Sequence, residues 1–168
     1  RPEALPDAVR RRAEELLIDV VGLCVAARRT PYVQALLGSV DAGGPCTAIG
    51  HDGTLRPEDA AMVNGTAAHG EDFDDTFEGG PVHTGAVILP AVLAACERFG
   101  RDGRAALLGT AVGVEVLCRL SHVIPKAIHN AGFHPTSVLG AMAATTGVAA
   151  ALGLSPRQTV DALGFPLP

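Results

Sequence analysis

Apolar residues recur at helical spacing along most of this chain, and polar or turn-forming residues mark the ends of each run. The clearest run spans residues 7–27 and carries Leu16, Leu17, Val20, Val21 and Cys24. This spacing brings the apolar side chains to one side and predicts a helix. Similar runs of apolar or small residues predict helices over residues 57–69, 86–99, 103–121 and 135–152.

Short motifs predict where several of these helices begin. Thr30-Pro31 has the form of an N-cap followed by proline at the first helical position, which predicts a short helix to about Leu37. Ser155-Pro156-Arg157-Gln158 has the form of a capping box and predicts a last helix. Pro90 lies inside the run 86–99, where it predicts a kink or a helix start.

Extended structure is predicted in one place only. Residues 46–56 form a strand-and-turn candidate with Asp52-Gly53 at the turn. Residues 70–84, rich in Gly and Asp, predict a loop between two helices. We therefore expect one all-α, multi-helix domain over residues 1–168.

Composition adds constraints on packing and partners. The chain has 168 residues, which is long enough to bury a core, and 48% are hydrophobic although only 4% are aromatic. Small side chains must therefore fill the interior, and Gly140, Ala144, Gly147 and Ala151 predict a face for close helix contact. The uncharged stretch 135–156 has the length of a membrane span, but its Ala, Gly and Thr content favours a buried helix.

Charge and cysteine spacing favour a cytoplasmic protein without nucleic-acid or membrane partners. The net charge is −5, and Arg10-Arg11-Arg12 is the one basic run, which a solvated helix end explains. The cysteines are far apart, show no CxxC spacing, and sit in apolar segments, which is typical of free, reduced thiols. They are Cys24, Cys46, Cys96 and Cys118.

The predicted loop concentrates titratable groups. Between His69 and His83 lie five acids: Glu71, Asp72, Asp74, Asp75 and Glu78. Unpaired charges near a core are costly to desolvate, so such a group more often transfers protons or holds a charged ligand. If the chain continued helically, His69, Asp72 and Thr76 would share one side and Asp74 and Asp75 would point elsewhere. Gly79-Gly80-Pro81 would then let His83 fold back toward Asp72, making a general acid–base pair.

Three other interpretations of this loop stay open. Asp74 or Asp75 could cap the following turn. His69 could be a histidine with its hydrogen bonds satisfied at a helix end. His69, Asp72, Asp74 and His83 could instead ligate a metal ion, although their spacing matches no standard site. We expect no metal and no cofactor.

A second motif, Gly132-Phe133-His134-Pro135-Thr136-Ser137, opens the predicted helix 135–152. Pro135 suits the first helical position and leaves His134 near the N-cap. The N–H groups of Thr136, Ser137 and Val138 would be free, with the positive end of the helix dipole behind them. His134 and the hydroxyl groups add donors, so this helix start predicts a site for a carboxylate. A plain helix cap with a surface histidine is the alternative.

Together these motifs resemble the MmgE/PrpD family, which includes 2-methylcitrate dehydratase, cis-aconitate decarboxylase and iminodisuccinate epimerase. The resemblance rests on the order and spacing of several strings over most of the chain. They are Asn64-Gly65, His69, Asp72-Phe73-Asp74-Asp75-Thr76, His83, Leu89-Pro90-Ala91, Glu97, Gly132-Phe133-His134-Pro135-Thr136 and Leu152-Gly153-Leu154.

The resemblance implies a fold, a chemistry and a set of site residues. It implies the family's N-terminal helical domain, in truncated form and without the lid domain, and a homodimer. It also implies cofactor-independent acid–base chemistry on a di- or tricarboxylate. The catalytic residues it implies are Asp72, His83 and His134. The substrate-binding residues we expect are His69, Thr76 and Thr136.

We expect a hydro-lyase acting on a substrate such as 2-methylcitrate. An isomerase or epimerase, or a decarboxylase, of the same family is the nearest alternative. A helical domain that only dimerises or binds a carboxylate is the alternative from a different class. The isolated chain is expected to turn over little substrate, because it would lack the family's cationic residues and a lid that excludes water.

Overall fold

The computed structural model describes residues 5–124 and 126–164, and most of these residues lie in helices. The helices are α1 (Asp7–Ala27), α2 (Pro31–Leu37), α3 (Pro57–His69), α4 (Gly85–Arg98), α5 (Gly103–Val123), α6 (Ala127–Asn130), α7 (Pro135–Leu152) and α8 (Pro156–Gly164). A two-stranded antiparallel sheet joins β1 (Ala42–Thr47) to β2 (Thr54–Leu55). The predicted all-α fold is confirmed.

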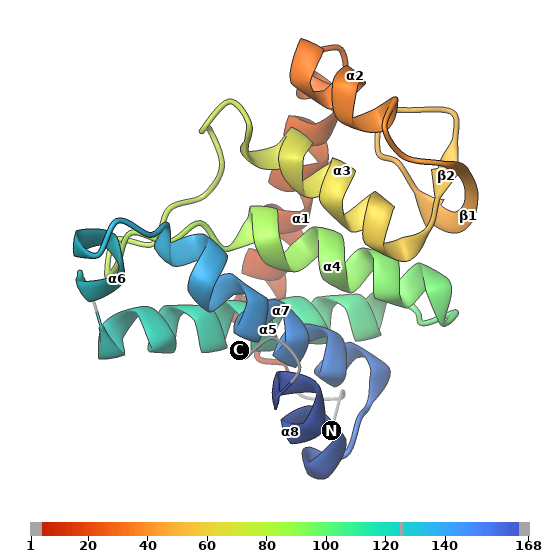
Figure 1. Ribbon diagram of the computed structural model, residues 1–168. Coiled ribbons are helices and arrows are strands. Elements are labelled where there is room, and N and C mark those ends of the chain that lie inside the picture. Colours follow the sequence, from red (N-terminus) through yellow and green to blue (C-terminus); the bar gives the residue numbers. More distant parts are fainter. Residues whose placement is uncertain (1–4, 125, 165–168) are drawn as a thin grey trace.

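Helix α4 is the centre of the molecule, between α3 and α7 (Figure 1). Its residues take part in three buried clusters, each formed with different neighbours. Ile88 and Val92 pack with Leu117 of α5 and Leu139 of α7, whereas Leu89 packs with Val20 of α1. Ala94 joins the third cluster, beneath the small sheet. Pro90 is buried inside this helix, which starts at Gly85 and runs past the proline.

Small residues let α7 approach two neighbours closely. A Cβ added at Gly109 of α5 would lie 2.6 Å from the Gly147 carbonyl oxygen, and one added at Gly147 would lie 2.8 Å from the Gly109 oxygen. A Cβ added at Gly140 would instead meet the Val87 side chain of α4 at 2.8 Å. The predicted small-residue face therefore divides between α5 and α4.

Asn64 and Glu97, two residues of the motifs that resemble the MmgE/PrpD family, form hydrogen bonds that hold the small sheet against the helices. The buried Asn64 accepts a hydrogen bond from the Ile49 N–H at 2.8 Å and donates one to the Thr47 carbonyl at 2.9 Å. Glu97 accepts from the Thr47 N–H at 2.8 Å and from the Thr47 hydroxyl at 2.5 Å. Both side chains therefore have structural roles away from the acidic loop.

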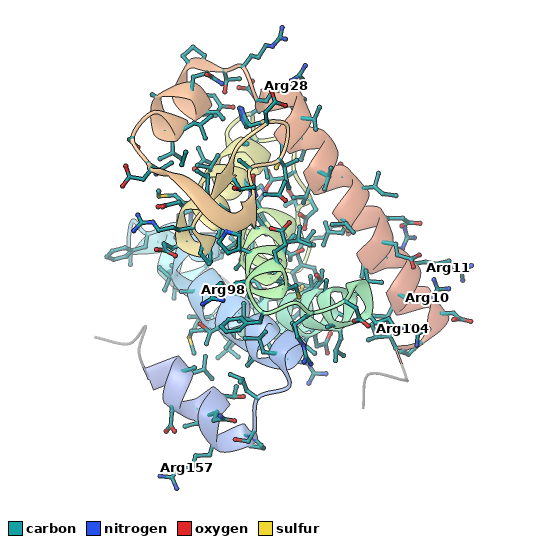
Figure 2. All side chains as sticks on the ribbon, turned by 90° about the vertical axis from the view of Figure 1, so that its right-hand side faces the viewer. Arg10, Arg11, Arg28, Arg98, Arg104 and Arg157 are labelled. Carbon is teal, nitrogen blue, oxygen red and sulfur yellow. The ribbon has the colours of Figure 1, made fainter. Side chains whose placement is uncertain are left out.

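Most predicted boundaries agree with the structure, but one strand starts earlier than predicted and one short helix was missed. The capping box of α8 is present, since Ser155 Oγ accepts from the Gln158 N–H and Gln158 Oε1 accepts from the Ser155 N–H. Strand β1 begins at Ala42, four residues before the predicted element, and the short α6 was not predicted. The labelled arginines are spread over several elements: Arg10 and Arg11 project from the start of α1, and Arg157 from α8 (Figure 2).

Helices α5 and α7 are long and apolar enough, by length and composition, to cross a membrane. Core helices of globular proteins pass the same test, so two such helices are weak evidence for a membrane protein. Here the two helices pack extensively on each other and on α4. Their apolar character has a sufficient explanation in this packing.

The crossing of α5 and α7 predicts the effect of adding one methyl group. Gly109→Ala should lower the free energy of unfolding by about 1–3 kcal/mol, because the new Cβ would overlap backbone and force the helices apart. Gly22→Ala is the matched control: Gly22 lies inside α1 with nothing within 4 Å of an added Cβ, so it should stabilise by about 0.5–1 kcal/mol. Urea denaturation followed by circular dichroism measures both. Equal stability of the two variants would contradict the close crossing.

Candidate active site

The acidic loop turns sharply as soon as α3 ends. The Asp72 N–H donates to the His69 carbonyl at 2.9 Å, and Asp72 has a φ of 57°, in the left-handed region that Asp tolerates better than most residues. The expectation of a helical turn through His69, Asp72 and Thr76 is therefore wrong. The turn reverses the chain and brings Asp74, rather than Asp72, next to His69.

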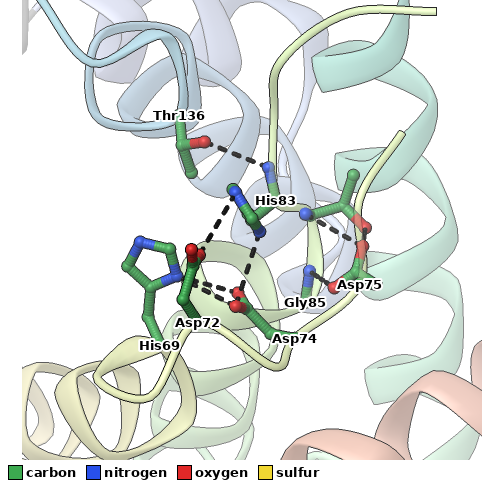
Figure 3. Close-up of polar contacts among 8 residues, drawn as sticks. His69, Asp72, Asp74, Asp75, His83, Gly85 and Thr136 are labelled. Atoms are coloured by element: carbon green, nitrogen blue, oxygen red, sulfur yellow. Dashed lines mark hydrogen bonds and ion pairs between the residues drawn. The ribbon is translucent and has the colours of Figure 1, made fainter. Parts of the chain in front are cut away.

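Asp74 contacts both histidines at the ends of the loop. Its side chain is 0% exposed, and both of its carboxylate oxygens lie 3.0 Å from Nδ1 of His69 (Figure 3). An ionised carboxylate only accepts hydrogen bonds, so His69 carries a proton on Nδ1 in this contact. A neutral His69 then has its lone pair on Nε2, which points away from Asp74 (Figure 3). The prediction that Asp74 points away from His69 is therefore wrong.

His83 lies between two carboxylates. Its Nδ1 is 3.4 Å from Asp74 Oδ1, and its Nε2 is 3.8 Å from Asp72 Oδ1. The Nδ1 atom is buried and makes no hydrogen bond of correct geometry to the described residues, although its distance to Asp74 is that of an ion pair. The predicted approach of His83 to Asp72 is confirmed, with Asp74 as the closer partner.

The start of α7 completes the cluster. The His83 N–H donates to Thr136 Oγ1 at 3.0 Å, which ties the loop to the first turn of this helix. His134, the N-cap residue, places its ring centroid 5.8 Å from that of His69 and 6.2 Å from that of His83. The rings of His69 and His83 are 4.8 Å apart. Three imidazoles from distant parts of the chain thus share one site.

Fewer backbone donors are free at this helix start than expected. The N–H groups of Ser137 and Val138 both donate to the His134 carbonyl, at 3.1 and 3.2 Å. The N–H of Thr136 therefore remains as the backbone donor for a ligand. The prediction of three outward N–H groups is corrected to one, because the first turn of α7 closes on its own N-cap carbonyl.

A pocket of about 680 Å³ opens beside the three histidines. Its walls come from α3, α4 and α7, and it is lined by Ala61, Met62, Gly65, Thr66, His69, Gly70, Ala86, Val87, His134, Thr136 and Ser137. Apolar and small residues form much of this wall, and the polar lining side chains are Thr66, His69, His134, Thr136 and Ser137. The volume falls in the range of about 300–1,000 Å³ that is usual for small-molecule sites.

The other predicted site residues lie at different distances from this pocket. The Asp72 side chain is 79% exposed, and its carboxylate lies 3.8 Å from His83, which is itself outside the pocket lining. Thr76 is exposed and is not among the residues that line the pocket. His69, His134 and Thr136 line the pocket, so the structure brings these three together with the Asp74–His83 pair.

Asp75 has a structural role instead. It accepts hydrogen bonds from the Thr84 N–H at 3.0 Å, the Thr84 hydroxyl at 2.6 Å and the Gly85 N–H at 2.7 Å. These donors belong to the start of α4, where a carboxylate also interacts favourably with the helix dipole. The interpretation that one of the paired aspartates caps the next helix is confirmed for Asp75.

The order of these motifs along the chain matches a known family over nearly the whole sequence. A family model for the MmgE/PrpD N-terminal domain matches residues 1–167. The chain belongs to the MmgE/PrpD family.

Several curated relatives of this MmgE/PrpD chain are named cis-aconitate decarboxylase. The protein from Aspergillus terreus is 33% identical over 171 residues, which cover 96% of this chain and 35% of that protein. The protein from Homo sapiens is 31% identical over 176 residues, again covering 96% of this chain and 35% of the relative. The chain thus spans about a third of the length of the curated relatives it matches.

The cysteines lie outside this MmgE/PrpD site. Cys24, Cys46 and Cys96 are buried and free, and Cys118 is free and half-buried. Burial raises the pKa of Cys24 to about 11 and also raises the pKa of Cys118 above its ordinary value. Since the thiolate is the reactive form, these side chains are poor nucleophiles at neutral pH.

The three hydrogen bonds to Asp75 predict the effect of removing its charge. Asp75→Asn should lower the free energy of unfolding by about 1–3 kcal/mol, because it removes the charge that holds three donors at the start of α4. Asp52→Asn, in an exposed turn, is the control and should change stability by less than about 0.5 kcal/mol. Urea denaturation tests this. Unchanged stability of Asp75→Asn would show that the cap at α4 contributes nothing.

Proposed function

We propose that this chain forms the proton-transfer and carboxylate-binding part of a lyase that acts on a di- or tricarboxylate without a cofactor. The observation that carries the proposal is the gathering of His69, His83 and His134 around buried Asp74, beside a pocket of about 680 Å³. Imidazoles and carboxylates in direct contact beside a pocket are typical of acid–base sites.

The proton-transfer role falls to His83, with Asp72 and Asp74 at its two ring nitrogens. A carboxylate at one nitrogen orients the ring and stabilises its protonated form, as required of a group that both takes and gives a proton. Asp74 also orients the ring of His69 through a 3.0 Å contact. Decarboxylation leaves an electron pair on carbon that must be protonated, and water elimination removes a C–H proton and protonates a leaving hydroxyl. Both reactions can use this arrangement.

Carboxylate binding falls to the start of α7. His134, the Thr136 N–H and the hydroxyl groups of Thr136 and Ser137 supply donors at the pocket wall. The lining residues that the structure describes include no Lys or Arg. A substrate carboxylate would therefore depend on protonated imidazoles for its positive partners in this part of the protein.

The relatives' names make cis-aconitate the first substrate to test, with loss of CO₂ as the reaction. Water elimination from 2-methylcitrate, the reaction expected from the sequence resemblance, is the second candidate, because the same histidine and aspartate pair could perform it. Thr76 as a substrate contact, a homodimer and a cytoplasmic location stay predictions.

Replacing His83 tests the proposal most directly. In the full-length protein, His83→Gln should lower kcat for the active substrate by about 10²–10⁴-fold, since the ring transfers the proton. His134→Gln should raise KM more than it lowers kcat, because it removes a partner of the substrate carboxylate. Proton NMR of reactions with cis-aconitate, 2-methylcitrate and iminodisuccinate separates loss of CO₂, loss of water and epimerisation.

His129→Gln is the matched control, because His129 is exposed on α6 and outside the pocket lining. Its kinetics should equal those of the unaltered protein. Unchanged turnover in both His83→Gln and His134→Gln would contradict the proposal. Calorimetry that detects carboxylate binding without turnover of any of these substrates would instead support the non-catalytic alternative.

A further inference from the structure

The cluster around Asp74 has a property that proton transfer does not require. One potential ligand atom from each of His69, Asp72, Asp74 and His83 lies within 4.8 Å of all the others. The set contains two imidazoles and two carboxylates from a stretch of fifteen residues, and the turn at Asp72 brings them together. Figure 3 shows the four side chains converging on one small volume.

Two of the separations already match those in a tetrahedral metal site. Zinc bonds to imidazole nitrogen and carboxylate oxygen at about 2.0–2.2 Å, so neighbouring ligand atoms in a tetrahedron are roughly 3.4 Å apart. His69 Nδ1 is 3.0 Å, and His83 Nδ1 is 3.4 Å, from Asp74 Oδ1. The Asp72 carboxylate is the ligand that would have to move, and its 79% exposure leaves it free to do so.

The Nδ1 atom of His83 is a second observation that favours a bound cation in this cluster. Nδ1 of His83 is buried and unsatisfied among the described residues, although buried polar atoms nearly always have a partner. A cation placed between His83 and Asp74 would satisfy that nitrogen and neutralise the buried carboxylate. The ligand set contains no thiol and mixes nitrogen with oxygen, which suits Zn²⁺ better than the hard cations Ca²⁺ and Mg²⁺.

We propose that His69, Asp72, Asp74 and His83 bind a Zn²⁺ ion. The two carboxylates balance the charge of the metal, and each imidazole gives it the lone pair of Nδ1, so the proton that His69 holds there toward Asp74 is released when the metal binds. An imidazole that ligates a metal cannot accept a proton at that nitrogen, so the bound ion would inhibit the proposed reaction. This inference goes beyond the proposed function, and metal binding can be measured without any substrate.

The test measures Zn²⁺ affinity by competition with a chromophoric chelator, using the full-length protein freed of metal. We expect one Zn²⁺ per chain with a Kd of about 10 µM or lower. X-ray absorption should show nitrogen and oxygen neighbours at about 2.0–2.2 Å and no sulfur at about 2.3 Å. The absence of sulfur separates this site from binding by the free cysteines.

Asp72→Asn is the sharpest variant. The side chain is exposed and Asn tolerates a left-handed φ, so the fold should be kept while the charged ligand is lost. It should weaken Zn²⁺ binding by at least about 10-fold, as should His83→Gln, because loss of even an outer-sphere partner costs about 10–100-fold. His129→Gln, away from the cluster, should leave the affinity within about 2-fold.

Each alternative outcome overturns the proposal. Failure to bind Zn²⁺ in the micromolar range, sulfur among the metal's neighbours, or unaltered affinity in Asp72→Asn would each exclude this site. Because the bound ion blocks the imidazoles, removal of the metal should raise turnover. Turnover that stays the same or falls on chelation would refute the inhibitory role, and metal-free protein that turns over none of the carboxylates would refute only the proposed function.

Discussion

The close approach of α7 to α4 and α5 is the constraint on which the site depends. Gly109, Gly140 and Gly147 remove the side chains that would otherwise separate these helices. Only at this spacing does the first turn of α7 reach the loop before α4, where Thr136 accepts the hydrogen bond from the His83 N–H. The packing of small residues deep in the core therefore sets the distance between His134 and His83 at the surface.

The neighbouring residues Asp74 and Asp75 have different roles: Asp75 caps α4, and Asp74 contacts the histidines. Adjacent side chains in an extended loop point in opposite directions, so Asp75 turns toward the start of α4 while Asp74 turns toward the histidines. The cap made by Asp75 fixes the end of the loop, and the turn at Asp72 fixes its beginning. Asp74 is held between these two anchors. Its position thus depends on contacts that take no part in proton transfer.

Local patterns predicted most of the fold but only part of the site. The spans of α1, α2, α3 and α7 followed from apolar spacing and from proline at the first helical position, since both are properties of a short stretch. The role of Asp74 could not be predicted in this way. It depends on a left-handed residue two positions earlier, and on His83, nine positions later, folding back. A loop has no periodicity from which such contacts could be inferred.

The charge balance of the cluster determines which ligand it can hold. Asp72 and Asp74 repel a substrate carboxylate, so anion binding at His134 requires that imidazoles of the cluster carry protons. A metal ion requires the reverse, because only an unprotonated imidazole nitrogen can ligate it. Carboxylate and metal should therefore compete for the imidazoles of one cluster. The four side chains of the proposed metal site, His69, Asp72, Asp74 and His83, all belong to the proposed acid–base site as well, so occupation by the metal excludes proton transfer there.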